Sequence, residues 1–321
     1  MKVVIPGGRR YIVNLPPSHE RLSALAVRAL REVEAYGVLP TPVDALYEKG
    51  GLSLISEQTF ADRTRGLLKS LPPALMRKAL LTANKVKGAT NLRTKRVWVP
   101  GQRNPAFERH PKLHEWGHNV IPWQDKPGFL DDRSTLSPET HDLFEREANF
   151  IAAEANFQAG LFRERALALK TSIQSALALA DEHGATYSST LWRYVEVMDT
   201  PVALLVYSKG RAHQFGATPR WLLRRINMSN AFGAAYESLE APKALGPGAY
   251  FLRTLDDDVT IADGRCKMRC EGSTPAFLWE SWSNTYSVFV MVRRAPLTSR
   301  VGGVLRAITS KEVAVEPQLI V

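Results

Sequence analysis

The sequence HEWGH at positions 114–118 has the residue types and spacing needed to bind a metal ion. On a helix, residues four apart lie on one face, so His114 and His118 could both reach a single ion. An HExxH pattern on a helix is typical of zinc hydrolases that cut peptide bonds, because the glutamate beside the first histidine can take a proton from water. The sequence therefore predicts a Zn²⁺ site with His114 and His118 as ligands and Glu115 as general base.

A catalytic zinc ion needs a third protein ligand, and residues 144–153 offer one. This stretch contains neither Gly nor Pro and is rich in Ala, Glu and Arg, so we expect a helix. Glu145 is the predicted third ligand, and Asn149, four residues later on the same face, is expected to orient a neighbouring ligand. Glu147 is the reserve metal ligand. For either glutamate, the alternative is a charge on a solvated helix face.

A short strand is expected at Val97, Trp98 and Val99, shortly before the metal-binding helix. At the edge of a sheet, such a strand could pair with an extended peptide substrate through main-chain hydrogen bonds. The alternative is an ordinary core strand, and the two do not exclude each other.

A further group should stabilise the negative charge that develops on the substrate's carbonyl oxygen. The sequence offers His110, His141 and Tyr187 without a reason to choose among them, and each could instead be structural.

The chain resembles the ImmA/IrrE family of metallopeptidases over roughly residues 20–160, about half of its length. HEWGH at 114–118 is followed by EREANFIAA at 145–153, and family members carry HExxH and then a helix with E-x-x-A-N-x-F-A-A. The upstream order also agrees: a helix, a short proline turn, a second helix and a Gly before a strand, from about 30 to 52. Asn104, Pro105 and Arg109 fit as well. Ile151 stands where Phe is usual.

The resemblance implies a zincin-like metallopeptidase domain, with His114, His118 and Glu145 as zinc ligands and Glu115 as general base. It also implies a substrate, namely a helix-turn-helix transcriptional repressor. Cleavage of that repressor would switch on stress, phage or mobile-element genes, so transcription regulation is the expected role. Family members of the IrrE type carry a sensor-like domain after a helical linker, and the order of elements here is similar.

The remaining elements predict an α+β protein in three parts, namely a metallopeptidase domain over 1–160, a helical segment over 161–200 and an α+β domain over 201–321. Apolar spacing predicts helices over 18–37, 42–49 and 74–86, and helices on both sides of a break at Gly184. This helical segment is compatible with a helix-turn-helix, although packing between domains is the alternative. In the last part we expect an antiparallel sheet. Strands are predicted at 202–207, 288–292 and 313–315.

Charge and apolar content suggest which partners and which cellular location to expect. The net charge is +10, and residues 1–113 hold 20 Lys or Arg against 8 Asp or Glu. This basic half could contact nucleic acid or an acidic partner, or could simply be a solvated surface. No apolar run is long enough for a membrane span and the start lacks a secretory signal, so we expect a cytoplasmic protein without a membrane partner.

Two alternatives to a peptidase stay open at this point. One is a non-catalytic regulator that binds DNA or a repressor through the basic N-terminal half, and the other is a zinc hydrolase with a different substrate. Cys266 and Cys270 most simply are two unrelated thiols, with a redox-sensing disulfide as the weaker option. Trp279, Trp282, Tyr286 and Phe289 could line a pocket, although aromatic residues of this kind more often form core.

Overall fold

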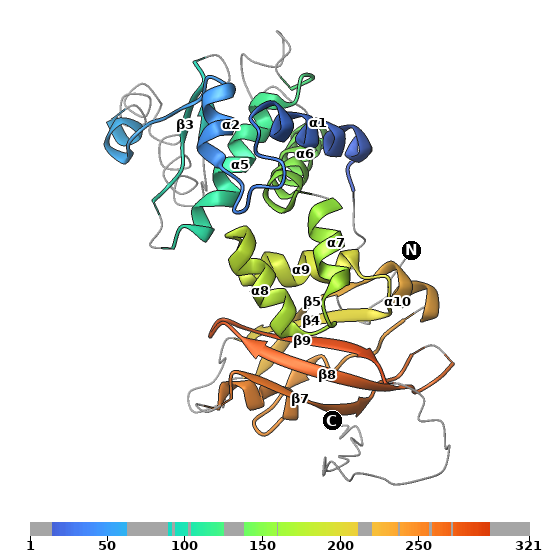
Figure 1. Cartoon of the computed structure of the whole chain (residues 1–321). Helices are drawn as coiled ribbons and strands as arrows, with labels where there is room; N and C mark the ends of the chain where they lie inside the picture. The colour runs from blue at the N-terminus through green and yellow to red at the C-terminus, as the bar shows by residue number, and fades with distance from the viewer. Residues whose placement is uncertain are drawn as a thin grey trace. The chain divides into compact units, whose positions relative to one another are not determined.

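The computed structural model describes residues 15–62, 89–91, 94–101, 104–124, 138–158, 160–210, 220–236, 238–256, 259–270 and 272–295 (Figure 1). The helix expected over 74–86 and the strand expected over 313–315 lie outside these residues. The described chain is α+β and forms two compact units. The N-terminal unit comprises Leu15–Phe162, apart from the gaps, and Ala180–Thr186; the C-terminal unit comprises Arg163–Leu179 and the described chain from Tyr187 onward.

The N-terminal unit contains α1 (His19–Glu32), α2 (Val43–Lys49), α5 (Ala106–Val120) and α6 (Pro138–Phe157). Buried apolar residues from each of the four helices share one core, as the apolar spacing predicts. Helix α1 ends earlier than expected. Glu34 and Gly37 both have positive φ, at 54° and 89°, and such residues interrupt an α-helix.

The N-terminal unit also holds a small sheet with the order β1-β3-β2, formed by β1 (Ser53–Leu54), β3 (Arg96–Trp98) and β2 (Ala89–Asn91). Strand β1 runs parallel to β3 and β2 runs antiparallel to it. The expected edge strand is therefore the middle strand of the described three, and Val99 lies beyond its end. A hydrophobicity pattern predicts strands but not which of them pair, and this explains why β3 was placed at an edge.

Helix α5 begins one and a half turns earlier than the sequence suggested. Proline is tolerated in a first helical turn but kinks a helix interior, so the sequence predicts a start near Pro111 and an end before Pro122. The helix instead begins at Ala106 and holds Pro111 inside. Asn104 defines the start, because its side-chain Oδ1 accepts the N–H of Ala106 at 2.9 Å and its carbonyl accepts that of Phe107 at 3.0 Å. The helix ends before Pro122, as expected.

Residues 161–197 are helical as predicted, in α7 (Gly160–Ala168), α8 (Ile173–His183) and α9 (Tyr187–Val197). Gly184 ends α8 with a φ of 56°, so the predicted break lies where expected. A further break at residues 169–172 was not anticipated.

The C-terminal unit is built on an antiparallel sheet with the order β6-β5-β4-β9-β8-β7. Its strands are β4 (Val202–Lys209), β5 (Trp221–Met228), β6 (Ala244–Leu245), β7 (Ile261–Lys267), β8 (Ala276–Ser283) and β9 (Ser287–Arg294). Successive side chains of a strand face opposite sides. Ala203, Leu205 and Tyr207 accordingly share a core with the short helices α10 (Asn230–Ala235) and η1 (Tyr250–Leu255). Asn227, on the other face, donates its amide to the carbonyl of Trp192 in α9 at 2.9 Å.

Trp279, Trp282 and Phe289 are buried in this unit, whereas Tyr286 is 81% exposed. The three buried rings pack as core, which was the alternative to a pocket. Cys266 and Cys270 are both buried and free. Within the described part of the chain, no helix combines the length and the apolar character required to cross a membrane.

Candidate metal centre

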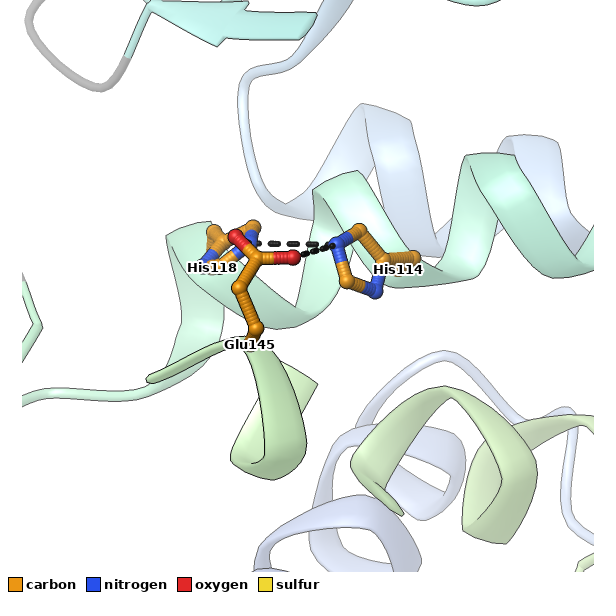
Figure 2. A group of neighbouring side chains, drawn as sticks. All are labelled: His114, His118 and Glu145. Atoms are coloured by element: carbon orange, nitrogen blue, oxygen red, sulfur yellow. Dashed lines mark hydrogen bonds and ion pairs between the residues drawn. The ribbon is translucent and has the colours of Figure 1, made fainter. Parts of the chain in front are cut away.

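His114, His118 and Glu145 meet where α5 and α6 lie against each other (Figure 2). The Nε2 atoms of the two histidines are 3.2 Å apart. The Glu145 carboxylate reaches both rings, with Oε2 at 3.3 Å from His114 Nε2 and Oε1 at 3.4 Å from His118 Nε2. The histidines come from one helix and the carboxylate from the other, as predicted. Two imidazole nitrogens and a carboxylate that converge in this way could hold a metal ion.

Gly117, inside the HExxH sequence, allows the two helices to approach this closely. A Cβ atom at this position would lie 2.7 Å from Ile151 Cγ2, 3.2 Å from the carbonyl oxygen of Ala148 and 3.3 Å from its Cα. Real side chains do not fit at such distances, so a glycine is required at the contact. The close approach matters for the site because Glu145 lies on α6, one turn before Ala148.

Glu147, the reserve ligand, points away from the cluster and bonds elsewhere. Its Oε1 accepts the hydroxyl of Ser18 at 2.5 Å, and its Oε2 accepts Trp123 Nε1 and Gln124 Nε2, both at 2.8 Å. The side chain is buried, at 3% exposed. The reserve assignment is therefore wrong, because Glu147 is two residues from Glu145 and lies on a different face of α6.

Gln124 contacts a predicted ligand directly and was missed by the sequence reasoning. Its Oε1 lies 2.8 Å from His118 Nδ1, the ring nitrogen that faces away from the cluster. Gln124 follows the end of α5 by four residues, in the turn that begins at Ile121 and Pro122. A glutamine in a turn carries no periodic signal, so only the fold reveals this contact.

Asn149 does not orient a metal-ligating ring, in contrast to the prediction. Its Nδ2 donates to the backbone carbonyl of Glu145 at 2.7 Å, and its Oδ1 lies 3.3 Å from Nε2 of His110. The residue is exposed. One turn along α6 places Asn149 beside His110 rather than His114, because α5 and α6 run in opposite directions at this contact.

Glu115 is buried in α5, with 4% of its surface exposed. Tyr47 of α2 packs nearby and donates its hydroxyl to the carbonyl of Lys112 at 2.8 Å. Burial raises the pKa of Tyr47 above its ordinary value, and the negative charge of Glu115 raises it further. The tyrosine therefore stays neutral beside the carboxylate proposed as the base.

The two histidines make Glu145 a stronger acid than a free glutamate. Hydrogen bonding to His114 and then to His118 lowers the pKa of its carboxyl far below the ordinary value, against the opposing effect of partial burial. Glu145 is therefore ionised at neutral pH, which is the form that binds a cation.

Of the three residues predicted as possible oxyanion stabilisers, His110 lies beside the cluster, with its ring centroid 6.5 Å from that of His114. His110 is exposed and bonds to Asn149, as above. His141 pairs loosely with Asp142, at 4.0 Å between Nδ1 and Oδ1. Tyr187 belongs to the C-terminal unit, where its ring lies edge-on to Trp282 at 5.3 Å between centroids.

Comparison with known proteins names no family for this chain. No protein-family model matches it, and no curated protein matches it. Among solved structures it is similar to a Mycobacterium tuberculosis transcriptional regulator, with a TM-score of 0.49 and 12% sequence identity over 86% of this chain and 79% of that chain. A likeness of this size carries no argument about activity, so function has to be argued from the His114, His118 and Glu145 cluster.

Proposed function

We propose that this chain is a zinc-dependent endopeptidase of the ImmA/IrrE type with a zincin-like N-terminal unit. The observation that carries the proposal is the convergence of His114, His118 and Glu145 from two helices. One ligand atom from each of the three side chains lies within 4.8 Å of the others.

The distances fit zinc. Nitrogen and oxygen ligands bind Zn²⁺ at about 2.0–2.1 Å, so ligand atoms at tetrahedral angles lie about 3.3 Å apart. The Nε2 atoms of His114 and His118 are 3.2 Å apart, close to that value. Glu145 offers a different oxygen to each ring, with Oε2 at 3.3 Å from His114 Nε2 and Oε1 at 3.4 Å from His118 Nε2. A site with three protein ligands leaves one position of a four-coordinate ion for water or substrate, which is the arrangement of catalytic rather than structural sites.

When bound, the zinc ion would polarise the scissile carbonyl and make a water molecule acidic enough to attack it near neutral pH. Glu115 would then take the proton of the attacking water and pass it to the leaving amine. Its position next to the ligand His114 on α5 favours this role, and at 4% exposed it is shielded from bulk water. Tyr47 would remain neutral throughout.

The substrate class rests on the family resemblance alone. It is a helix-turn-helix repressor, cut in the cytoplasm to release stress, phage or mobile-element genes. The basic N-terminal half would help to attract an acidic partner or a repressor bound to DNA.

A cleavage assay with Glu115→Gln tests the proposal. The purified chain should cut a helix-turn-helix repressor encoded near its own gene, and chelation should stop the reaction. Glu115→Gln should keep the zinc and lose cleavage by at least about a hundredfold, the lower end of the range for general acid–base catalysis. Glu108→Gln is the matched control, because Glu108 lies on the same helix and pairs with Lys112 at 3.1 Å; it should cut normally.

Cleavage by Glu115→Gln at the native rate would exclude Glu115 as the base. Salt-sensitive binding to DNA by both the native chain and Glu115→Gln, with no cleavage by either, would favour a regulator instead.

A further inference from the structure

His118 uses its two ring nitrogens in opposite directions. Nε2 faces the cluster, 3.4 Å from Glu145 Oε1, and Nδ1 faces Gln124 Oε1 at 2.8 Å. A neutral imidazole carries one proton, on either nitrogen, and only the nitrogen without a proton can bind a metal. Whatever fixes the proton on Nδ1 therefore makes Nε2 available as a ligand.

The surroundings of Gln124 fix which end of its amide faces the ring. Its Nε2 lies 2.8 Å from Glu147 Oε2 and 3.4 Å from the carbonyl oxygen of Phe144. Both neighbours are acceptors, so the amide must turn its NH₂ group toward them and its oxygen toward His118. An amide oxygen can only accept, so Nδ1 of His118 must carry the proton.

The Glu147 carboxylate is held in place by three hydrogen bonds. Its two oxygens accept from Ser18, Trp123 and Gln124, which come from the segment before α1 and from the turn after α5. Arg21 of α1 also stacks over the Trp123 ring at 4.7 Å, which holds the same turn in place. Gln124 and Glu147 are 2% and 3% exposed, so water does not compete effectively for these bonds.

We propose that Gln124 and Glu147 are positioning residues that lock His118 in the tautomer with Nδ1 protonated and Nε2 aimed at the metal. This inference rests on the proposed metal site and adds to it the reason why His118 is ready to bind. Outer partners of metal-binding histidines typically change metal affinity by about ten- to a hundredfold. Loss of the Gln124 amide should weaken metal binding by that factor.

Metal titration of the full chain tests the inference without an activity assay. Zn²⁺ affinity is measured by competition with a chelating indicator, and the visible spectrum of bound Co²⁺ reports the coordination geometry. Gln124→Leu should lower the affinity about ten- to a hundredfold and alter the Co²⁺ spectrum. Trp123→Phe is the matched control, because it removes the other donor to Glu147 Oε2 and leaves Gln124 and His118 in contact. It should bind within about threefold of the native chain, well inside that range.

Glu147→Leu tests the second positioning residue. It removes the acceptor that holds the NH₂ group of Gln124, so it should lose metal affinity by about ten- to a hundredfold, as Gln124→Leu does; native affinity in a folded Glu147→Leu would remove Glu147 from the proposal. If Gln124→Leu does not fold, Gln124→Asn keeps a polar group but is one methylene too short to bridge His118 and Glu147. It should show the same loss.

Native affinity and a native Co²⁺ spectrum in folded Gln124→Leu would overturn the inference and leave the metal site standing. Equal losses in Gln124→Leu and Trp123→Phe would also overturn it, because packing of the turn would then explain both. If the native chain binds neither metal, the proposed function fails first and the inference with it.

Discussion

Replacing Gly117 by alanine should separate α5 from α6 and weaken metal binding while the chain stays folded. The added Cβ would lie 2.7 Å from Ile151 Cγ2, whereas carbon atoms in contact prefer about 3.5–4.0 Å. Ile151 cannot swing away easily, because a β-branched side chain in a helix has one strongly preferred rotamer. The other two close atoms belong to the backbone of Ala148. The helices must therefore move apart by about 1 Å.

The consequence for the site follows from the same distance. If α6 retreats by about 1 Å, Glu145 would lie about 4.3 Å from the histidine nitrogens, instead of the about 3.3 Å that a tetrahedral ion requires. Overpacking costs about 1–3 kcal/mol, and alanine in a helix recovers about 1 kcal/mol relative to glycine. The fold should thus lose about 0–2 kcal/mol, whereas zinc affinity should fall at least about tenfold.

Two measurements on Gly117→Ala separate these effects: denaturant unfolding without metal and zinc titration of the folded variant. Gly160→Ala is the control, since a Cβ at that helical glycine meets nothing within 4 Å. Adding Ile151→Ala to Gly117→Ala removes the closest contact and should restore part of the affinity. Native zinc affinity in Gly117→Ala, or no recovery in the double variant, would refute the argument that this contact sets the position of Glu145.

Three further predictions concern groups outside the metal centre. Burial raises the pKa of Cys266 and of Cys270 to about 11, so at pH 8 only about one thiol in a thousand is ionised. Iodoacetamide should therefore label neither cysteine until the chain is unfolded. Rapid labelling of the folded chain at pH 8 would contradict this. Gln158 is fully buried and joins the end of α6 to the loop after α1 through the N–H of Gly37 and the carbonyls of Ala35 and Val38. Gln158→Ala should therefore lower the free energy of unfolding by about 1–3 kcal/mol, while the exposed Gln58→Ala changes it little. Tyr47→Phe loses one hydrogen bond and should cost about 0.5–1.5 kcal/mol in the same assay with zinc binding unchanged; a loss of zinc would assign Tyr47 a role in the site.

Much of the metal centre could be predicted from the sequence because its spacing is local. His114 and His118 are one helical turn apart, and Glu145 lies in a segment with strong helix propensity, so each half of the site is readable within a few residues. The antiparallel sheet of the C-terminal unit was also predictable from its apolar strands. The close contact between α5 and α6 could not be predicted. The glycine at position 117 is required by residues of α6, which are distant in sequence.

The errors have the same origin. Glu147 and Asn149 were given roles from their position on one helix, but their partners Ser18, Trp123 and His110 lie on other segments. Strand β3 was placed at an edge because the pattern along a strand does not show that it pairs with β1. Long-range hydrogen bonds of this kind depend on how helices and strands meet, and one sequence does not encode that in its periodicity.

The metal content of the purified chain tests the central claim most directly. The native protein should hold one zinc ion per chain after dialysis, and His118→Ala and Glu145→Ala should each hold far less while remaining folded. A folded native chain that takes up no zinc, or a Glu145→Ala variant that binds it as tightly as the native protein, would contradict the assignment of these three side chains as a metal centre.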